Sequence, residues 1–302
     1  MSETVKQNSL RAWLLASRPK TLTAAAVPVM IGSATTWHET QGVGMEYVAM
    51  TLCFLFAFVM QIDANFVNDY YDCVRGCDNE QRLGPQRACQ QGWVTLRAMR
   101  LAIAITSVLA CIVGLPLVLY GGWQLIWVGI ACLVFCFLYT TMLAGKGLGD
   151  LLVLLFFGLV PCYFTYYVTM PAELHTFTNA NVWLLSLATG CVVDTLLLVN
   201  NYRDINNDSS VGKRTLVVLL GKMPTEWLYF LIVPVAITLV IVSLSSSWWQ
   251  GLYAIAVLIP HLHTWYTMRK IGEGTALNRV LGMTARNIFI FGILTTVLII
   301  LS

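Results

Sequence analysis

Long apolar stretches separated by short polar segments make up most of the sequence from residue 21 onward. Each stretch approaches the roughly 17–25 residues that a helix needs to cross a bilayer. The pattern predicts nine membrane-spanning helices, near Thr21–Trp37, Tyr47–Phe66, Ala98–Leu119, Trp123–Leu143, Leu148–Met170, Val182–Asn200, Trp227–Leu244, Trp249–Met268 and Ala285–Leu301. The first stretch contains Pro28 and Gly32 and precedes further spans, so we interpret it as a span and not as a cleaved leader. We expect an all-α, polytopic membrane protein in which residues 1–302 form a single membrane domain.

The composition supports this interpretation. Hydrophobic residues make up 58% of the chain and charged residues 11%, whereas a soluble domain carries about 25% charged residues. The net charge of +3 gives no indication of nucleic-acid binding. Nine cysteines, an odd number, lie mostly within the predicted spans or on their cytoplasmic side. They indicate reduced thiols and not a disulfide framework.

The positions of the basic residues predict how the helices are oriented. All 18 Lys and Arg residues lie in the N-terminal segment, in alternate loops or at the span ends next to these loops, and none lies in His38–Glu46, Tyr120–Gly122, Pro171–Asn181 or Ser245–Ser247. By the positive-inside rule, the N-terminus and the basic loops are cytoplasmic and the C-terminus lies outside. We therefore expect a multi-pass protein of the cytoplasmic (inner) membrane, with its chemistry at the cytoplasmic face.

Two acidic motifs lie at the cytoplasmic ends of predicted spans. The first has polar residues spaced three or four apart or adjacent, Asn65, Asn68, Asp69 and Asp72, and is followed by Asp78. The second has Asn200, Asp204 and Asp208, each four residues after the last. Helical periodicity places each set on one helix face. Such oxygen donors suit Mg²⁺, which is commonly shared between protein carboxylates and substrate phosphates.

An alternative is that both motifs are solvated helix ends capped by Asn and Asp. Two matched motifs in a chain with few charges favour a functional site, because ionisable groups near a bilayer are costly. A shift of 132 residues superimposes Asn68–Asp72 on Asn200–Asp204. Four spans separate the two copies, so both face the same way. We predict a parallel repeat of two half-bundles around a central cavity.

Basic residues follow each motif: Arg82 and Arg87 follow the first, and Lys213 and Arg214 follow the second. They suit a diphosphate, although the positive-inside bias alone also accounts for basic residues here. A diphosphate bound beside apolar spans indicates a prenyl diphosphate. Its developing carbocation needs aromatic faces and exclusion of water, and the candidate aromatic residues near the motifs are Tyr70, Tyr139 and Tyr202.

These residues resemble the two aspartate-rich motifs of the UbiA-type membrane prenyltransferases. The resemblance extends over nearly the whole chain and is specific for the 1,4-dihydroxy-2-naphthoate polyprenyltransferase branch. The stretches that carry it are Ser17–Leu22, Arg82–Arg87, Gly147–Asp150 after Tyr139-Thr140, and Asn200–Leu216.

The resemblance implies transfer of a polyprenyl group from polyprenyl diphosphate to 1,4-dihydroxy-2-naphthoate, with loss of CO₂ and diphosphate, to form demethylmenaquinol in menaquinone biosynthesis. It implies nine helices around a cavity, and Mg²⁺ as cofactor, with a metal site formed by Asn68, Asp69, Asp72, Asp204 and Asp208. The expected diphosphate-binding residues are Asn68, Arg82, Arg87, Lys146, Asn200, Arg203 and Lys213. Tyr139 is expected near the allylic cation, and the aspartates Asp69, Asp72, Asp204 and Asp208 share the catalytic assignment with it.

Three other functions remain as alternatives. A secondary transporter also has repeats, but its polar groups lie near the membrane midplane, whereas both motifs here lie at one edge. An alcohol phosphatidyltransferase has its acids in a single motif. Within the prenyltransferases, the acceptor could be another aromatic acid such as 4-hydroxybenzoate. Asp63 and Asp194 lie deeper in their spans, and the resemblance gives neither a role.

Overall fold

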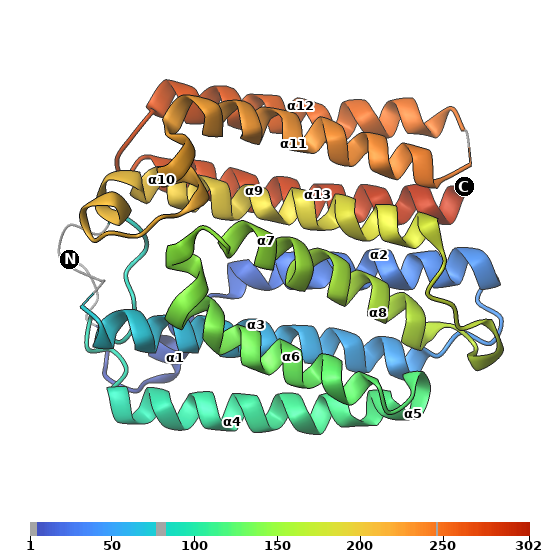
Figure 1. Cartoon of the computed structure of the whole chain (residues 1–302), viewed down its shortest axis with the longest axis horizontal. Coiled ribbons are helices and arrows are strands. Elements are labelled where there is room, and N and C mark those ends of the chain that lie inside the picture. Colours follow the sequence, from blue (N-terminus) through green and yellow to red (C-terminus); the bar gives the residue numbers. More distant parts are fainter. Residues whose placement is uncertain (1–4, 77–82, 246) are drawn as a thin grey trace.

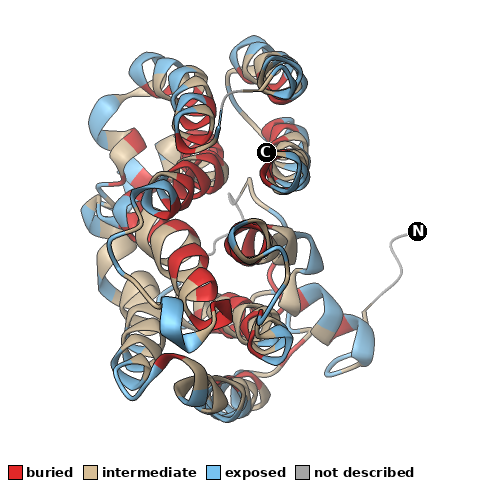
Figure 2. Cartoon of the chain, turned by 90° about the vertical axis from the view of Figure 1, so that its right-hand side faces the viewer, coloured by how far each residue is buried: buried red, intermediate tan, exposed pale blue. Residues whose placement is uncertain are grey.

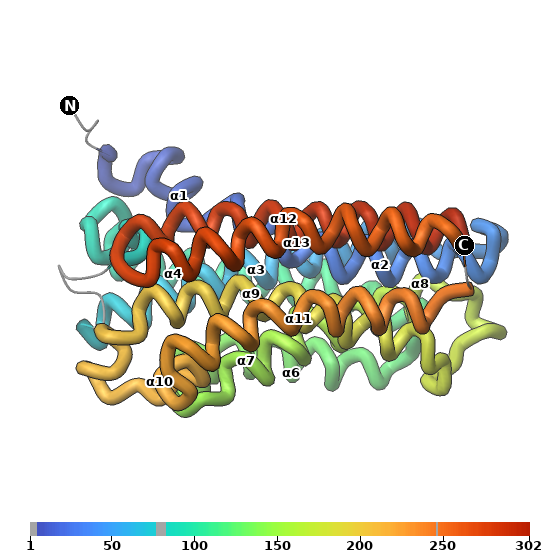
Figure 3. The backbone as a smooth tube through the Cα atoms, turned by 90° about the horizontal axis from the view of Figure 1, so that it is seen from above, coloured from blue at the N-terminus to red at the C-terminus, as the bar shows by residue number. Residues whose placement is uncertain are grey.

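The computed structural model describes residues 5–76, 83–245 and 247–302. Over these residues the regular structure is entirely helical, and the long helices run side by side along one axis (Figures 1 and 3). The elements in chain order are α1 (Leu10–Ser17), η1 (Pro19–Thr21), α2 (Leu22–Thr40), α3 (Tyr47–Val74), α4 (Leu96–Gly114), η2 (Leu115–Leu117), α5 (Val118–Gly121), α6 (Leu125–Leu138), η3 (Tyr139–Leu143), η4 (Ala144–Lys146), α7 (Gly149–Leu154), η5 (Leu155–Leu159), α8 (Val160–Thr169), η6 (Ala172–Leu174), α9 (Ala180–Ser210), α10 (Leu216–Leu220), α11 (Lys222–Ser243), α12 (Trp249–Ile271) and α13 (Leu277–Leu301).

Within the described residues, seven helical segments are long and apolar enough to cross a membrane. They are Tyr47–Val74, Leu96–Gly121, Leu125–Lys146, Gly149–Thr169, Ala180–Ser210, Lys222–Ser243 and Leu277–Leu301. The all-helical, polytopic membrane architecture predicted from the sequence is confirmed. Helices α2 and α12 coincide with the first and eighth predicted spans but are less apolar than these seven. The count of nine spans and the division into half-bundles therefore stay predictions.

Two helices extend beyond their predicted ends, and both extensions carry an acidic motif. Helix α3 continues from Phe66 to Val74, so the first motif forms its last two turns. Helix α9 continues from Asn200 to Ser210 and includes the second motif. Each motif is thus part of a long helix that runs to the opposite end of the bundle and packs against its neighbours, and this fixes the position of its side chains.

The buried residues lie on the helix sides that face other helices (Figure 2). The largest cluster joins α2, α7, α8, α9, α11, α12 and α13 and includes Val27, Ile31 and Phe291. Large apolar side chains such as Trp127 and Ile255 are more than half exposed on the outside of the bundle. Lipid tails are as apolar as these side chains, so this surface suits a bilayer and not water.

Small residues allow two helices to approach closely near the middle of the bundle. A Cβ atom added to Gly158 would lie 2.4 Å from the Gly190 Cα, and one added to Gly190 would lie 2.8 Å from the Leu154 carbonyl oxygen. Because such distances exclude any side chain, the backbones of η5 and α9 are in direct contact. This contact fixes the α7–η5–α8 rod, which forms one wall of the cavity, against the helix that carries the second motif.

Candidate active site

A cavity of about 1000 Å³ lies between the helices. Its walls come from α1 and η1, α2, α3, α4, α6, α7, α8, α9 and α13, and most of its lining side chains are apolar. Three of the polar lining residues, Asn68, Arg87 and Asn200, come from the helix ends that carry the acidic motifs and from the segment after α3. The cavity therefore has a polar mouth and a long apolar interior.

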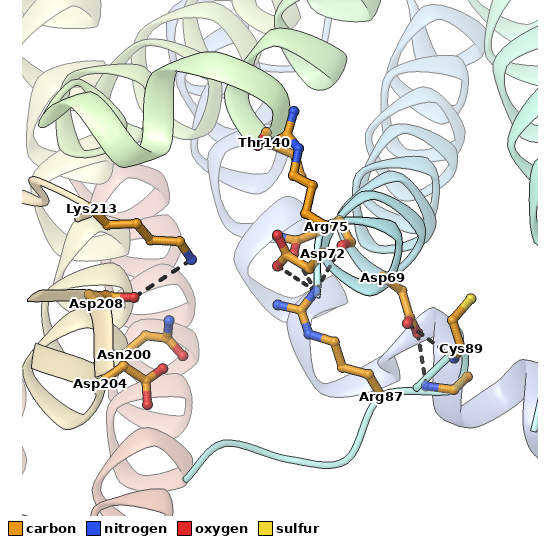
Figure 4. Close-up of polar contacts among 12 residues, drawn as sticks. Asp69, Asp72, Arg75, Arg87, Cys89, Thr140, Asn200, Asp204, Asp208 and Lys213 are labelled. Atoms are coloured by element: carbon orange, nitrogen blue, oxygen red, sulfur yellow. Dashed lines mark hydrogen bonds and ion pairs between the residues drawn. The ribbon is translucent and has the colours of Figure 1, made fainter. Parts of the chain in front are cut away.

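Arg87 links two residues of the first motif at this mouth. Its Nη1 donates to the Asn68 Oδ1 atom at 2.6 Å and to the Asn68 carbonyl oxygen at 2.8 Å. The same nitrogen forms an ion pair with Asp72 Oδ2 at 2.7 Å. Arg87 and Asp72 are mostly buried, with 7% and 14% of their side chains exposed. The sequence-predicted residues Asn68, Asp72 and Arg87 are thus brought together, as Figure 4 shows for Asp72 and Arg87.

Asp69 points away from this group towards the segment that follows α3. Its Oδ2 accepts a hydrogen bond from the Ala88 backbone N–H at 2.9 Å, and its Oδ1 accepts one from Cys89 at 3.2 Å (Figure 4). The residue is 1% exposed. Its carboxylate anchors the turn that carries Arg87. Burial, together with the nearby charges of Asp69 and Cys73, raises the pKa of the Cys89 thiol.

In the second motif, Arg203 is directed into the protein. Its guanidinium donates to Asp204 Oδ1 at 2.8 Å, to Asn200 Oδ1 at 2.9 Å and to Asn278 Oδ1 at 2.9 Å. Its side chain has no exposed surface. Arg203 therefore fixes the carboxylate of Asp204 and the amide of Asn200 from the buried side of the helix.

The predicted Lys213 and Lys146 lie in neighbouring loops. Lys213 Nζ lies 3.6 Å from Asp208 Oδ1, and its side chain extends from the second motif towards Asp72 in Figure 4. The Arg214 backbone N–H donates to the Gly145 carbonyl oxygen at 2.9 Å, which joins the loop after α9 to the segment carrying Lys146. Lys146 itself is exposed. The predicted Arg82, like Asp78, lies outside the described residues.

Of the three predicted tyrosines, all in the described part of the chain, Tyr139 lines the cavity. The Tyr202 hydroxyl donates to Glu226 at 2.7 Å within a buried cluster, and Tyr70 packs edge-to-face on Tyr71. Neither Tyr70 nor Tyr202 belongs to the cavity lining.

Arg75 is a residue whose role the sequence did not reveal. It donates to the carbonyl oxygens of Thr140 and Thr141 at 3.0 and 2.8 Å (Figure 4). These carbonyls belong to η3, a turn of π-helix that begins at Tyr139. Arg75 follows Asp72 by three residues, which places both on one side of α3. This spacing is the sequence signal that could have connected it with the motif.

The oxygen donors at the mouth suit a hard divalent cation. Asp72 and Asp204, one from each motif, lie close enough to Asp208 to act on it electrostatically. Each of these three carboxylates now has a cationic partner. Within the described residues no three His, Cys, Asp or Glu side chains already form a compact metal-binding group. A cation shared with a phosphate needs only one or two carboxylates from the protein, and the mouth supplies them from both sides.

Comparison with known proteins identifies the family. The model of the UbiA prenyltransferase family matches residues 25–283. The chain belongs to the UbiA prenyltransferase family.

Several relatives within this UbiA family carry the name 1,4-dihydroxy-2-naphthoate octaprenyltransferase. The one from Escherichia coli (strain K12) is 33% identical over 97% of this chain and 96% of its own length. The one from Mycobacterium leprae (strain TN) is 32% identical over 80% of each chain.

Among solved structures, a UbiA homolog from Aeropyrum pernix K1 has the same fold, with a TM-score of 0.67 and 15% identity over 90% of this chain and 97% of that one. A UbiA homolog from Archaeoglobus fulgidus, solved bound to DMAPP and Mg²⁺, has a TM-score of 0.60 and 12% identity over 94% of this chain and 99% of that one.

Proposed function

We propose that this UbiA-family protein transfers a polyprenyl group from polyprenyl diphosphate to 1,4-dihydroxy-2-naphthoate, releasing diphosphate and CO₂ and forming demethylmenaquinol. The observation that carries the proposal is the junction of two acidic helix ends with one long apolar cavity. A polar diphosphate fits the mouth, and a prenyl tail fits the interior. The names of the bacterial relatives support naphthoate as the acceptor.

Asp72, Asp204 and Asp208 are the proposed Mg²⁺ ligands, with Asn68 and Asn200 as additional oxygen donors. When bound, Mg²⁺ neutralises the leaving diphosphate and so weakens the allylic C–O bond. For Asp69 we propose a positioning role, because both of its oxygens already accept hydrogen bonds from backbone amides.

The cations at the mouth exchange partners when the substrate binds. Arg87 and Lys213 now pair with Asp72 and Asp208. With Asp72 and Asp208 acting as ligands of a bound cation, both basic side chains would be free to bind the diphosphate oxygens. Lys146 approaches from the neighbouring loop, and Arg82 keeps the diphosphate-binding role proposed from the sequence. Arg203, which is fully enclosed, acts by holding Asp204 and Asn200.

Tyr139 is proposed to stabilise the allylic cation with its ring face. The cavity wall continues from Tyr139 to Leu125 along α6, which is about 21 Å at 1.5 Å per residue. This apolar depth accommodates several isoprene units and excludes water from the cation.

The membrane arrangement follows from the same proposal. We add α2 and α12 to the seven apolar helices, giving nine spans in one domain made of two parallel half-bundles. The basic loops and the mouth of the cavity face the cytoplasm, and the C-terminus faces outwards. The bilayer is the cytoplasmic membrane, from which the lipid-soluble donor enters.

The test is an assay of membrane fractions with geranylgeranyl diphosphate, Mg²⁺ and either 1,4-dihydroxy-2-naphthoate or 4-hydroxybenzoate. The expected result is a prenylated naphthohydroquinone, recovered as the quinone after oxidation by air, with release of CO₂ from the naphthoate alone. Product from 4-hydroxybenzoate alone would replace the acceptor but keep the diphosphate site. No product from either acceptor in folded protein would overturn the proposal.

A further inference from the structure

One cavity wall holds a buried polar atom that lacks a partner. Gln61 on α3 lines the cavity and is 8% exposed. Its Oε1 atom is buried and accepts no hydrogen bond. A buried acceptor without a donor is costly, so its retention in a cavity wall indicates a ligand that supplies the donor. None of the roles given above for diphosphate, metal or prenyl tail uses this atom.

The neighbouring Asn65 fixes which end of the Gln61 amide is left without a partner. Asn65 Nδ2 lies 2.9 Å from the Ser17 carbonyl oxygen, which can only accept, so this end of Asn65 must be the donor. The Asn65 Oδ1 atom therefore faces Gln61, whose Nε2 donates to it at 3.4 Å. The unpartnered atom of Gln61 must then be its oxygen.

Asn65 also holds the turn that brings two cations to the cavity. Its Nδ2 donates to the Thr21 Oγ1 atom at 3.0 Å as well as to Ser17. Between these two contacts the chain turns at Arg18, which has the left-handed φ of 49°, and Thr21 closes the turn by donating to the Arg18 carbonyl oxygen at 2.9 Å. Arg18 and Lys20 both line the cavity.

The charged side chains that line the cavity all carry the same sign. Among the lining residues that the structure describes, Arg18, Lys20 and Arg87 are cationic, and none is Asp or Glu. Arg87 forms an ion pair with Asp72 of the first motif. Arg18 and Lys20 come from a different element, the α1–η1 junction. Both lie between Ser17 and Thr21, the two residues that bind the Asn65 amide beside Gln61. The diphosphate cations Lys146 and Lys213 are not part of this lining.

We propose that Gln61, Arg18 and Lys20 form the subsite of the aromatic acceptor. This inference rests on the proposed function and adds the residues that bind its second substrate. The acceptor carboxylate binds Arg18 and Lys20, and a ring hydroxyl donates to Gln61 Oε1. The apolar residues Met60 and Ala64 of α3, which also line the cavity, are available to the ring. A hydroxyl that donates to an amide oxygen gains electron density, and this makes the adjacent ring carbon a better nucleophile. Asn65 is a positioning residue for both parts of the subsite.

The test compares Michaelis constants in the purified full-length protein. Gln61→Leu and Arg18→Gln are each expected to raise KM for 1,4-dihydroxy-2-naphthoate about tenfold, the effect of losing one hydrogen bond or ion pair in a closed site. KM for geranylgeranyl diphosphate should change less than about twofold. Lys146→Gln is the matched control, because it removes a cation at the mouth and should raise KM for the diphosphate instead. An unchanged acceptor KM in both Gln61→Leu and Arg18→Gln would overturn the subsite.

A binding measurement keeps the test independent of turnover. Wild-type protein should bind 1,4-dihydroxy-2-naphthoate about tenfold more tightly than 2-naphthoate, which lacks both hydroxyls, and Gln61→Leu should bind the two equally. If Gln61→Leu retains the discrimination, the assignment of Gln61 is wrong. If wild-type protein consumes 4-hydroxybenzoate and not the naphthoate, the proposed function fails. The same variants are then measured with 4-hydroxybenzoate. A raised KM for this acceptor would support the subsite, and an unchanged KM would overturn it.

Discussion

Arg203 on α9 donates a hydrogen bond to Asn278 on α13 at 2.9 Å, and Asn278 in turn donates to the Leu83 carbonyl oxygen at 2.8 Å. Leu83 belongs to the segment that leads from the first motif towards Arg87. A single side chain of α13 therefore connects the second acidic motif to the loop that follows the first. The two halves of the mouth are held at a fixed separation, as binding one diphosphate between them requires.

This connection predicts the effect of Asn278→Ala. The variant should raise KM for prenyl diphosphate severalfold, because both sides of the mouth lose a shared anchor. The matched control is Asn287→Ala on the same helix, since Asn287 also bridges helices, by donating to Pro260 and Thr264, but does not line the cavity. Both variants should lower thermal stability, by about 1–3 kcal/mol each. Steady-state kinetics and thermal unfolding in detergent separate the two effects. Equal KM changes in both variants would contradict the connection.

The two acidic motifs should differ from other buried carboxylates in their response to Mg²⁺. Asp72→Asn and Asp204→Asn should abolish turnover at limiting Mg²⁺ while the protein still inserts into the membrane. Asp63→Asn is the control on α3, because Asp63 accepts hydrogen bonds from the hydroxyls of Thr106 and Ser107 and serves helix packing. It should retain the wild-type Mg²⁺ dependence. The measurement is a Mg²⁺ titration of initial rates, and near-normal rates in either motif variant would refute the metal assignment.

Asp69→Asn should have a different effect, which can be followed at Cys89. The raised pKa of this thiol keeps it protonated, and therefore unreactive, at neutral pH. Removing the Asp69 charge removes one of the causes that raise the pKa, so the thiolate should appear at lower pH. The rate of alkylation by iodoacetamide, followed at the Cys89 peptide by mass spectrometry, should then rise at lower pH than in wild-type protein. An unchanged pH profile would show that Asp69 does not act on this turn.

The sequence predicted the two acidic motifs but not which contacts each of their residues makes. Helical spacing correctly put Asn68, Asp69 and Asp72 at the end of one helix. One step along a helix turns a side chain by about 100°, and this difference directs Asp69 to the Ala88 turn and Asn68 to Arg87. That assignment depends on how the segment after α3 folds back, for which the sequence carries no local signal.

The mean hydropathy of α2 and α12 is lowered by polar side chains that are hydrogen-bonded within their own helix. In α2 and α12 the hydroxyls of Thr35 and Thr264 donate to the carbonyl oxygens of Ile31 and Pro260, four residues earlier. Polar side chains that are satisfied within their own helix cost less in a bilayer than a hydropathy scale assumes. The sequence pattern therefore placed these two helices correctly, although their composition alone does not show that they cross the membrane.

Tyr139 and Arg75 provide a last prediction, on the cation itself. If the Tyr139 ring face stabilises the allylic cation, Tyr139→Phe should keep most of the activity, and Tyr139→Leu should lose about 2- to 30-fold in kcat, the range expected for a cation–π contact of about 0.5–2 kcal/mol. Tyr70→Leu is the control, because Tyr70 lies near the first motif but does not line the cavity. It should leave kcat within about twofold of wild type.

Arg75→Gln tests whether the π-helical turn positions that ring. Glutamine is too short to reach both carbonyl oxygens that Arg75 now binds, those of Thr140 and Thr141. The variant should therefore lower kcat without raising KM for either substrate, because Arg75 touches neither. Combining Arg75→Gln with Tyr139→Leu gives the decisive measurement. If the arginine acts through the ring, the double variant should be no slower than Tyr139→Leu alone, since coupled residues are not additive. A fully additive loss in kcat would mean that Arg75 acts elsewhere in the site.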